Sequence, residues 1–286
     1  MYSCVVSDEL GRLAKLGWIV PDVEVDGVCY FPSRDSGAIS YPVEGFDVLG
    51  LEGGSGYWFD HRATAVARHI KSLGISSMWE VGAGTGAMAH RLRDMLSEVV
   101  TVEPLATGAR ASAALGLMSL CGTLQDLQLP DRCLQSIGVF DVLEHLGHPA
   151  ILVEEMHRVL QPDGLVIATV PAFQTLWGDE DDVAGHKRRY TKSTLAVEFT
   201  ERGFISIRRE YLYASLVVPA GVLRAVPYRL GRRSSREAVL KSLRSQLATR
   251  PITNRLAGAV LRGETAVAKF VPLPIGLTVL GAFRKR

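Results

Sequence analysis

Residues 80–90, E-V-G-A-G-T-G-A-M-A-H, are the most informative stretch of the chain. The apolar run 77–81 predicts a short buried strand, and the residues after Gly86 predict a helix. Between them, glycines at alternate positions 82, 84 and 86 let the backbone adopt positive φ and let a ligand approach it closely. In open α/β sheets, ligands bind beyond the carboxyl ends of the strands. We therefore expect this loop to line a binding site.

Outward from this loop, apolar runs alternate with segments of helical periodicity such as 63–73 and 149–160. The predicted strands are 77–81, 98–103, 117–122, 134–143, 165–170, 204–213 and 276–284. This alternation indicates a parallel sheet covered by helices on both faces. The predicted fold class is α/β, with a seven-stranded, mostly parallel, doubly wound sheet and a helical insertion before the last strand.

The composition suggests three parts. Residues 1–50 are punctuated by turn residues and predict a small β-rich extension of short strands and turns. Residues 51–213 and 273–286 form the predicted core, and 214–272 the helical insertion. From residue 211 to the end there are 14 Lys+Arg and 2 Asp+Glu, although the net charge of the whole chain is only +2. This asymmetry indicates either a surface that faces an anionic partner or a solvated helical surface.

Several classes of protein are disfavoured. The four cysteines contain no C-x-x-C pair, which argues against a zinc site and a disulfide scaffold and predicts a reducing compartment. The start, M-Y-S-C-V-V-S-D-E-L, lacks the features of a secretory signal. The apolar run 270–283 is shorter than the roughly 20 residues that a spanning helix needs. We expect a cytoplasmic protein, with peripheral contact of the insertion with an anionic membrane as an open alternative.

The acidic residue at the end of the second core strand points to the ligand. Glu103 lies 17 residues after Gly86, where its carboxylate can accept hydrogen bonds from both hydroxyls of a ribose. The spacing G-x-G-x-G differs from the dinucleotide fingerprint, because residue 87 is alanine rather than glycine. The pattern favours an adenosine-containing cofactor, and the alternative is an ordinary tight turn between strand and helix.

A family resemblance joins these features. E-V-G-A-G-T-G with V-E-P, followed by L-P-D…F-D-V-L-E-H-L and E-M-H-R-V-L-Q-P-D-G-L, resembles the class I S-adenosylmethionine-dependent methyltransferase superfamily over about residues 57–210. The resemblance implies a Rossmann-like fold and S-adenosylmethionine as cofactor. The cofactor-binding residues that it implies are Glu80, Gly82, Ala83, Gly84, Gly86, Glu103, Asp126, Phe140 and Asp141.

The resemblance also implies a role for each of these residues. Glu80 and the glycine loop would hold the methionine part of the cofactor, and Glu103 the ribose. Asp126 would lie beside the adenine amine. Phe140 and Asp141 would lie under the reactive sulfonium.

The segment Asp141-Val-Leu-Glu144-His145 is similar to the E-x-x-E-H element of ubiquinone-pathway O-methyltransferases. That similarity implies a divalent cation held by Asp141, Glu144 and His145, with aspartate replacing the first glutamate. The same V-L-E-H string also occurs in superfamily members not known to need a metal. We therefore favour a metal-free site, in which Glu144 caps the next segment and His145 lines the cofactor pocket.

The segment G-H-K-R-R-Y, residues 185–190, resembles the G-H-x-R-R-Y element of a bacterial methyltransferase group found near glycan- and lipid-assembly functions. His186 is the expected general base, because its near-neutral pKa suits proton removal, and His145 is a second catalytic candidate. Arg188, Arg189 and Tyr190 would bind an anionic or hydroxylated acceptor. A structural alternative is that Arg189 pairs with Asp179 to hold the loop.

The segment G-Y-W-F-D-H-R, residues 56–62, is similar to the W-F-x-x-R entry segment of the same group. Trp58 and Arg62 are therefore expected to contact substrate, with Trp58 and Phe59 covering the cofactor. Packing of the two aromatic rings in the core is the alternative.

The leading functional prediction is O-methylation of a small metabolite, sugar or lipid-linked intermediate. One alternative is a nucleic-acid (RNA) methyltransferase that uses the basic insertion. Against it, no N-P-P-Y or D-P-P-Y follows the fourth strand. A second alternative is a non-catalytic protein that binds S-adenosylmethionine or acts as a scaffold.

Overall fold

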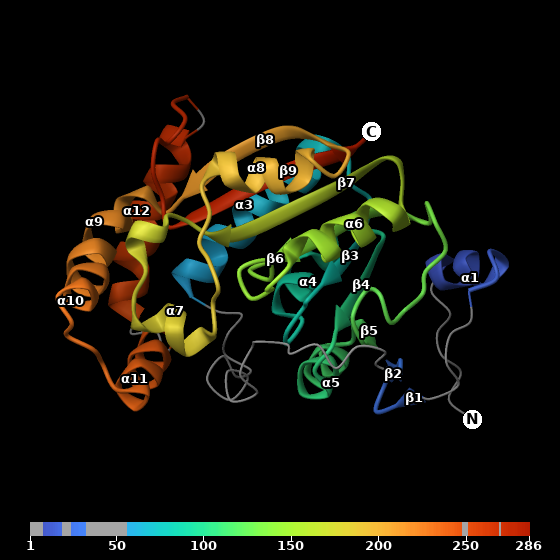
Figure 1. Ribbon diagram of the computed structural model, residues 1–286, viewed down its shortest axis with the longest axis horizontal. Helices are drawn as coiled ribbons and strands as arrows, with labels where there is room; N and C mark the ends of the chain where they lie inside the picture. Colours follow the sequence, from blue (N-terminus) through green and yellow to red (C-terminus); the bar gives the residue numbers. More distant parts are fainter. Residues whose placement is uncertain (1–7, 19–23, 33–55, 248–250, 269) are drawn as a thin grey trace.

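The computed structural model (Figure 1) describes residues 8–18, 24–32, 56–247, 251–268 and 270–286. Its described strands form one sheet in the order β1-β2-β5-β4-β3-β6-β7-β9-β8. The pairs from β2 through β7 are parallel, while β1–β2, β7–β9 and β9–β8 are antiparallel. The prediction of a mostly parallel, doubly wound α/β sheet is confirmed.

The strands are β1 (Glu24–Val25), β2 (Val28–Tyr30), β3 (Ser77–Val81), β4 (Glu98–Glu103), β5 (Met118–Cys121), β6 (Leu134–Phe140), β7 (Leu160–Pro171), β8 (Phe204–Leu212) and β9 (Thr278–Lys285). The α-helices are α1 (Asp8–Lys15), α3 (Tyr57–Leu73), α4 (Ala87–Leu92), α5 (Ala106–Ala114), α6 (Pro149–Val159), α7 (Asp179–Ala184), α8 (Lys192–Thr200), α9 (Val217–Ala220), α10 (Val226–Arg229), α11 (Arg236–Leu247) and α12 (Pro251–Ala268). Short helical turns are η1 (Arg93–Met95), η2 (Gln174–Leu176), η3 (Ala214–Leu216) and η4 (Gly221–Ala225), the last a π-helical turn.

The seven predicted core strands correspond to β3–β9, with differences at their ends. β6 stops at Phe140 rather than at 143, because the next residue, Asp141, has a φ of 54° and turns the chain out of the sheet. β7 begins at Leu160, since Leu160 already pairs with Leu134 ahead of an irregularity in the ladder. Helix α3 begins at Tyr57, six residues before the predicted segment 63–73.

Two hydrophobic layers cover the sheet. Side chains of α6 and α8 pack with one face, where Trp79 of β3 is fully buried. Side chains of α3 and α4 pack on the other, together with Leu261 of α12. Strand order reverses around β3, which lies between β4 and β6. The glycine loop leaves the carboxyl end of β3 and therefore lies at the position where open α/β sheets bind ligands.

The N-terminal part contains a helix where only short strands and turns were expected. In α1, Leu13 is fully buried in the main core, and the Arg12 guanidinium donates a hydrogen bond of 2.5 Å to the carbonyl of Cys133. Tertiary contacts thus stabilise a short helix that the sequence does not mark. The hairpin β1–β2 extends the sheet beside β5. Much of the predicted 1–50 extension lies outside the described residues.

The segment between β8 and β9 is mainly helical in its described part. Figure 1 shows α9–α12 gathered at one end of the molecule, beside α7. Among the described helices, none combines the length and the apolar character required to cross a bilayer.

Candidate functional site

The glycine loop has a backbone that other residues would strain. Gly82, Gly84 and Gly86 have φ values of 71°, 56° and 75°, in the left-handed region. A Cβ on Gly82 would lie 2.5 Å from Cγ2 of Val142, and one on Gly86 would lie 2.4 Å from Oγ of Ser112. Both conformation and space therefore require glycine at these two positions.

Glu103, at the end of β4, holds this loop in place. Its Oε2 accepts a hydrogen bond of 2.9 Å from the N–H of Gly84, and its Oε1 accepts one of 2.9 Å from the N–H of Leu105. Burial raises the pKa of Glu103 to about 7, although these two hydrogen bonds oppose the shift. The expected ribose-binding residue is thus beside the loop and fixed in orientation.

Glu80, in β3, offers a polar atom without a partner. The side chain is buried, and its Oε2 has no hydrogen-bond partner in the described part of the chain. Burial raises the pKa of Glu80 to about 8, while a hydrogen bond from the backbone of Ala89 and the charge of Arg62 oppose the shift. A cationic group that reached Oε2 would stabilise the carboxylate, so the site fits the ammonium of the expected cofactor.

Asp126 lies in the turn after β5, on the same side of the loop as Glu103. Its Oδ2 accepts hydrogen bonds from the backbone N–H and the hydroxyl of Thr123, at 2.9 and 2.7 Å. The backbone N–H of Gly122 in turn donates to the carbonyl of Glu103 at 3.2 Å. The expected adenine-side and ribose-side residues are therefore connected through this turn.

On the other side of β3, Asp141 has a strained backbone and a carboxylate in an ion pair. Its φ of 54° is unusual for a residue other than glycine and is typical of functional positions. Its carboxylate forms an ion pair with Arg62 of α3 and accepts a hydrogen bond of 3.0 Å from Thr169. Arg62, expected at the acceptor, thus reaches the carboxyl end of β6 beside the cofactor residues. Phe140 packs in the same cluster as Phe59.

Trp58 is held by a residue that the sequence did not single out. Its ring stacks on Tyr213 with 3.8 Å between the centroids and 2° between the planes. The hydroxyl of Tyr213 also donates a hydrogen bond of 2.5 Å to the carbonyl of Trp58. These contacts place the start of α3 against the end of β8.

The segment around G-H-K-R-R-Y is organised by Asp181 of α7. This buried carboxylate contacts His186 Nδ1 at 2.7 Å and accepts hydrogen bonds from Arg189 Nε at 2.8 Å and from the Gly178 N–H at 2.8 Å. Burial alone would raise the pKa of Asp181, but the bonds from His186 and Arg189 outweigh it and hold this pKa below its usual value. The prediction that Arg189 pairs with Asp179 is wrong: its partner is Asp181, which lies on the buried side of α7.

The other two residues of the segment also make internal contacts. Arg188 donates hydrogen bonds to the carbonyls of Leu146 and Gly147, at 3.2 and 2.7 Å. Tyr190 is buried, and its hydroxyl donates to the carbonyl of Leu143 at 3.3 Å. These contacts support a structural role for both side chains. His186 keeps 17% of its side chain exposed.

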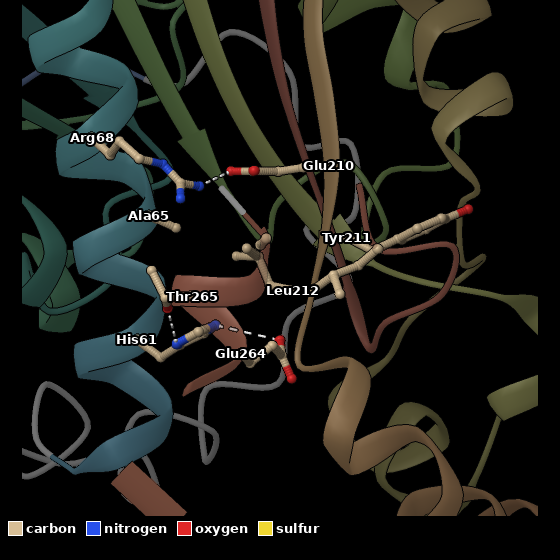
Figure 2. A pocket seen from close by; sticks show the side chains of 10 residues that line it. His61, Ala65, Arg68, Glu210, Tyr211, Leu212, Glu264 and Thr265 are labelled. Carbon is tan, nitrogen blue, oxygen red and sulfur yellow. Dashed lines mark hydrogen bonds and ion pairs between the residues drawn. The ribbon is translucent and has the colours of Figure 1, made fainter. Parts of the chain in front are cut away.

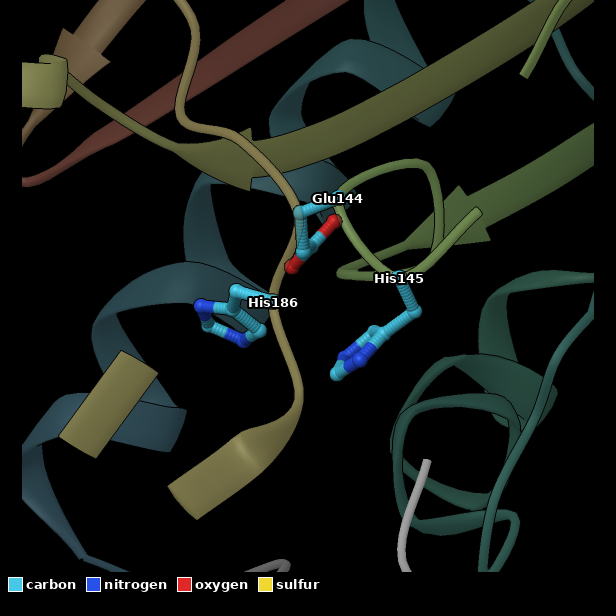
Figure 3. Close-up of side chains that lie close together, drawn as sticks. All are labelled: Glu144, His145 and His186. Carbon is cyan, nitrogen blue, oxygen red and sulfur yellow. The ribbon is translucent and has the colours of Figure 1, made fainter. Parts of the chain in front are cut away.

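Three side chains converge between β6 and α8. Figure 3 shows Glu144 and His145 from the turn after β6 and His186 from the segment after α7. One potential ligand atom from each lies within 4.8 Å of the other two. The N–H of Lys187 donates a hydrogen bond of 2.7 Å to the carbonyl of Glu144, which joins the two segments. Asp141, expected as a ligand with Glu144 and His145, is paired with Arg62 and does not belong to this group.

A separate pocket lies between α3, β8 and α12 (Figure 2). His61 Nε2 of α3 lies 3.7 Å from Glu264 Oε1 of α12, and Glu264 Oε2 accepts hydrogen bonds of 2.8 Å from the backbone and hydroxyl of Ser215. Arg68 and Glu210 form an ion pair on its other side. The polar groups lining this pocket are engaged with one another, and they anchor the insertion to α3.

Comparisons with known proteins agree with this geometry. A family model described as a methyltransferase domain matches residues 79–168. A probable S-adenosylmethionine-dependent methyltransferase of Mycolicibacterium smegmatis is 30% identical over 117 residues, which cover 40% of this chain and 46% of that protein. One of Mycobacterium tuberculosis is 25% identical over 155 residues, which cover 53% and 57%. The chain thus matches about half the length of these relatives.

Solved structures agree on the fold. A protein from Galdieria sulphuraria described as a sarcosine dimethylglycine methyltransferase superposes with a TM-score of 0.52 at 16% identity, covering 78% of this chain and 85% of that one. Identity at this level concerns the fold alone. The matching domain model and the relatives lead to one conclusion: residues 79–168, which include the glycine loop, are similar to the methyltransferase domain of S-adenosylmethionine-dependent methyltransferases.

Proposed function

We propose that this protein is an S-adenosylmethionine-dependent methyltransferase that methylates a hydroxyl group of a lipid-linked, sugar or small-metabolite acceptor. The observation that carries the proposal is the arrangement of Glu80, the glycine loop and Glu103 at the strand-order reversal. The bound cofactor would supply a methyl group activated by a positively charged sulfonium.

Different residues of the chain bind different parts of the cofactor. The unpartnered Oε2 of Glu80 receives the cofactor's ammonium, and the carboxylate of Glu103 receives the ribose hydroxyls while it keeps the loop in place. Asp141 and Arg62, joined as an ion pair, close the side of the site next to β6. The ring of Phe140, packed against α3, excludes water there.

An oxygen acceptor must lose a proton as it is methylated, and the reacting atoms must be aligned. His186 is placed to promote that loss, because Asp181 fixes the orientation of its ring and leaves the Nε2 side available. The segment that carries His186 lies against the turn after β6, through the bond between Lys187 and Glu144. The acceptor would therefore approach between these two segments.

The insertion supports a lipid-linked acceptor. A row of apolar residues along α9–α10 is 48–74% exposed: Val218, Val222, Leu223, Val226 and Leu230. Their spacing places most of them on one helical face. Arg229, Arg232 and Arg233 follow at the end of that row and are exposed. An apolar face bordered by arginines matches the surface of an anionic membrane.

The same helices contact the segment that carries His186. Tyr228 donates a hydrogen bond of 2.9 Å to Asp182 of α7, and Arg233 pairs with the same carboxylate at 2.9 Å. Nε of Arg224 lies 3.2 Å from Oε1 of Glu180. A protein bound to a membrane through this face would hold α7 and His186 close to a lipid-linked substrate. We propose peripheral association with the inner membrane face on this basis.

Two measurements test the proposal. Calorimetric titration with S-adenosylhomocysteine is expected to show binding that Glu103→Ala weakens, and no binding to wild-type protein would refute the cofactor assignment. Cofactor carrying a tritiated methyl group is then incubated with protein and either total lipid extract or total RNA. Base-stable label in the organic phase is expected. Label in RNA would favour the nucleic-acid alternative. A third incubation with a water-soluble extract tests sugar and metabolite acceptors, and cofactor binding without transfer in any of the three incubations would favour a non-catalytic protein.

A further inference from the structure

The cluster of Glu144, His145 and His186 (Figure 3) has a composition and a position that the cofactor site does not explain. Glu144 and His145 come from the turn after β6, and His186 comes from the segment between α7 and α8, 41 residues later in the chain. The backbone bond from Lys187 to Glu144 fixes these segments relative to each other. Three ligand-type side chains therefore converge from two segments that are bonded to each other.

Glu144 is the strongest indication of a missing partner. It is fully buried, and neither carboxylate oxygen has a hydrogen-bond partner in another residue of the described chain. Buried carboxyl groups are normally hydrogen-bonded, paired with a cation or bound to a metal. A cation between Glu144 and the two histidines would satisfy this group.

The two histidine rings lie beside Glu144. Oδ1 of Asp181 lies 2.7 Å from Nδ1 of His186, so this buried carboxylate orients the ring and leaves Nε2 on the side away from it. A carboxylate that orients a histidine in this way commonly supports a metal-binding ring. The ring of His145 lies next to that of His186, with 4.7 Å between the two centroids.

We propose that Glu144, His145 and His186 bind one divalent transition-metal ion. Two imidazole nitrogens and one carboxylate are a donor set that suits Zn²⁺, Fe²⁺, Mn²⁺ or Co²⁺ better than Mg²⁺ or Ca²⁺. Three protein ligands leave at least one coordination position open, as in catalytic zinc sites. The site differs from the Asp141-based set implied by the sequence, since His186 replaces Asp141.

The position suggests a use, which rests on the proposed function. An acceptor hydroxyl bound at the open position would have its pKa lowered by the ion, so its proton would leave more easily before methyl transfer. In that arrangement His186 promotes proton loss as a ligand of the ion, and Asp181 is a positioning residue. Metal binding itself does not depend on this use.

The test is metal titration of the tag-free full chain after treatment with EDTA. We expect uptake of one equivalent of Zn²⁺ in calorimetry and, with Co²⁺, visible absorption bands of a low-coordinate site. Glu144→Gln resembles the protonated carboxyl group, so it should keep the fold while it weakens Zn²⁺ binding at least 10-fold; His145→Ala should do the same. His148→Ala is the matched control, because His148 is exposed and lies three residues from His145.

Titration with S-adenosylhomocysteine in parallel separates this proposal from the proposed function. No Zn²⁺ uptake at 100-fold excess, or uptake that Glu144→Gln and His145→Ala leave unchanged, overturns the metal site even where S-adenosylhomocysteine binds. Uptake that both variants weaken supports the site even where S-adenosylhomocysteine fails to bind, in which case only the proposed function is lost.

Discussion

The carboxylate of Glu103 accepts a hydrogen bond from the backbone N–H of Gly84 at 2.9 Å, so the end of β4 holds the middle of the glycine loop. Its other oxygen accepts a bond from the N–H of Leu105, the residue before α5. One side chain thus connects the loop after β3 with the start of the helix after β4. A residue that the sequence marks only as a ribose ligand also organises the site before any ligand arrives.

Replacement of Glu103 should therefore weaken cofactor binding in two ways. Glu103→Ala removes the proposed ribose acceptor and also frees the Gly84 N–H. We expect S-adenosylhomocysteine to bind about 10–100-fold more weakly, since hydrogen bonds to charged groups contribute about 1.5–3 kcal/mol. Calorimetric titration measures the effect. Glu98→Ala, at the opposite end of β4, is the control and should bind normally; equal losses in both variants would contradict this role.

Gly82 should tolerate no side chain. Gly82→Ala places a methyl group 2.5 Å from Cγ2 of Val142 and holds alanine at a φ of 71°. Overpacking and a left-handed backbone each cost about 1–3 kcal/mol, so thermal unfolding should occur at a clearly lower temperature. Gly147→Ala is the matched control, because a methyl group there would meet no described atom within 4 Å. If both variants unfold at the same temperature, the strain argument fails.

The fold follows from the sequence wherever local periodicity and sheet position agree. β4 matches its predicted range, 98–103, because four β-favouring residues, V-V-T-V at 99–102, lie between two glutamates and are followed by Pro104. α1 was not predicted, since its stability depends on burying Leu13 and on the contact of Arg12 with Cys133, far away in the chain. Long-range contacts of this kind leave no local signal.

The same contrast between local sequence signals and long-range contacts applies to the site. The glycine loop and Glu103 are identifiable because strand ends and glycine spacing are local features. The role of Asp181 depends on which side of α7 faces the core, and four acidic residues at 179–182 look alike in sequence. Likewise, the proximity of His186 to Glu144 arises only when β6 and β7 pair and bring their following segments together.

Glu80 should make stability depend on pH. Its folded pKa of about 8 lies above the ordinary 4.5, so the folded state favours the protonated form. The stabilisation that protonated Glu80 gives the folded state is fully present below pH 4.5 and is lost as pH rises through 8. Between these values the free energy of unfolding falls by up to about 1.4 kcal/mol per pH unit. Glu80→Gln, permanently neutral, should lose less stability than wild type between pH 5.5 and 8.5 in urea unfolding without cofactor. Equal losses of unfolding free energy in wild type and Glu80→Gln would show that Glu80 does not cause the pH dependence.

The apolar face of α9–α10 should bind membranes. Leu223, in the helical turn between α9 and α10, is 74% exposed, so Leu223→Asp should reduce binding to anionic phospholipid vesicles several-fold. Sedimentation with vesicles containing phosphatidylglycerol, compared with phosphatidylcholine alone and with high salt, measures the effect. Ile151→Asp, at a solvent-exposed position of α6, is the control. Salt-insensitive binding, or equal effects of both variants, would argue against this surface.

Asp181 should be far more important for stability than its neighbour Asp182. Asp181 is buried and bonded to Arg189 and His186, whereas the side chain of Asp182 is 45% exposed and pairs at the surface. Asp181→Asn leaves the guanidinium of Arg189 without its buried anion, and breaking such a pair costs about 3–5 kcal/mol. Asp182→Asn should cost less than about 1 kcal/mol, as exposed ion pairs do. Urea unfolding of both variants gives the comparison. Adding Arg189→Met to Asp181→Asn should restore part of the loss, because the orphaned charge is removed; a further loss of stability in the double variant would show that Arg189 has a second essential partner.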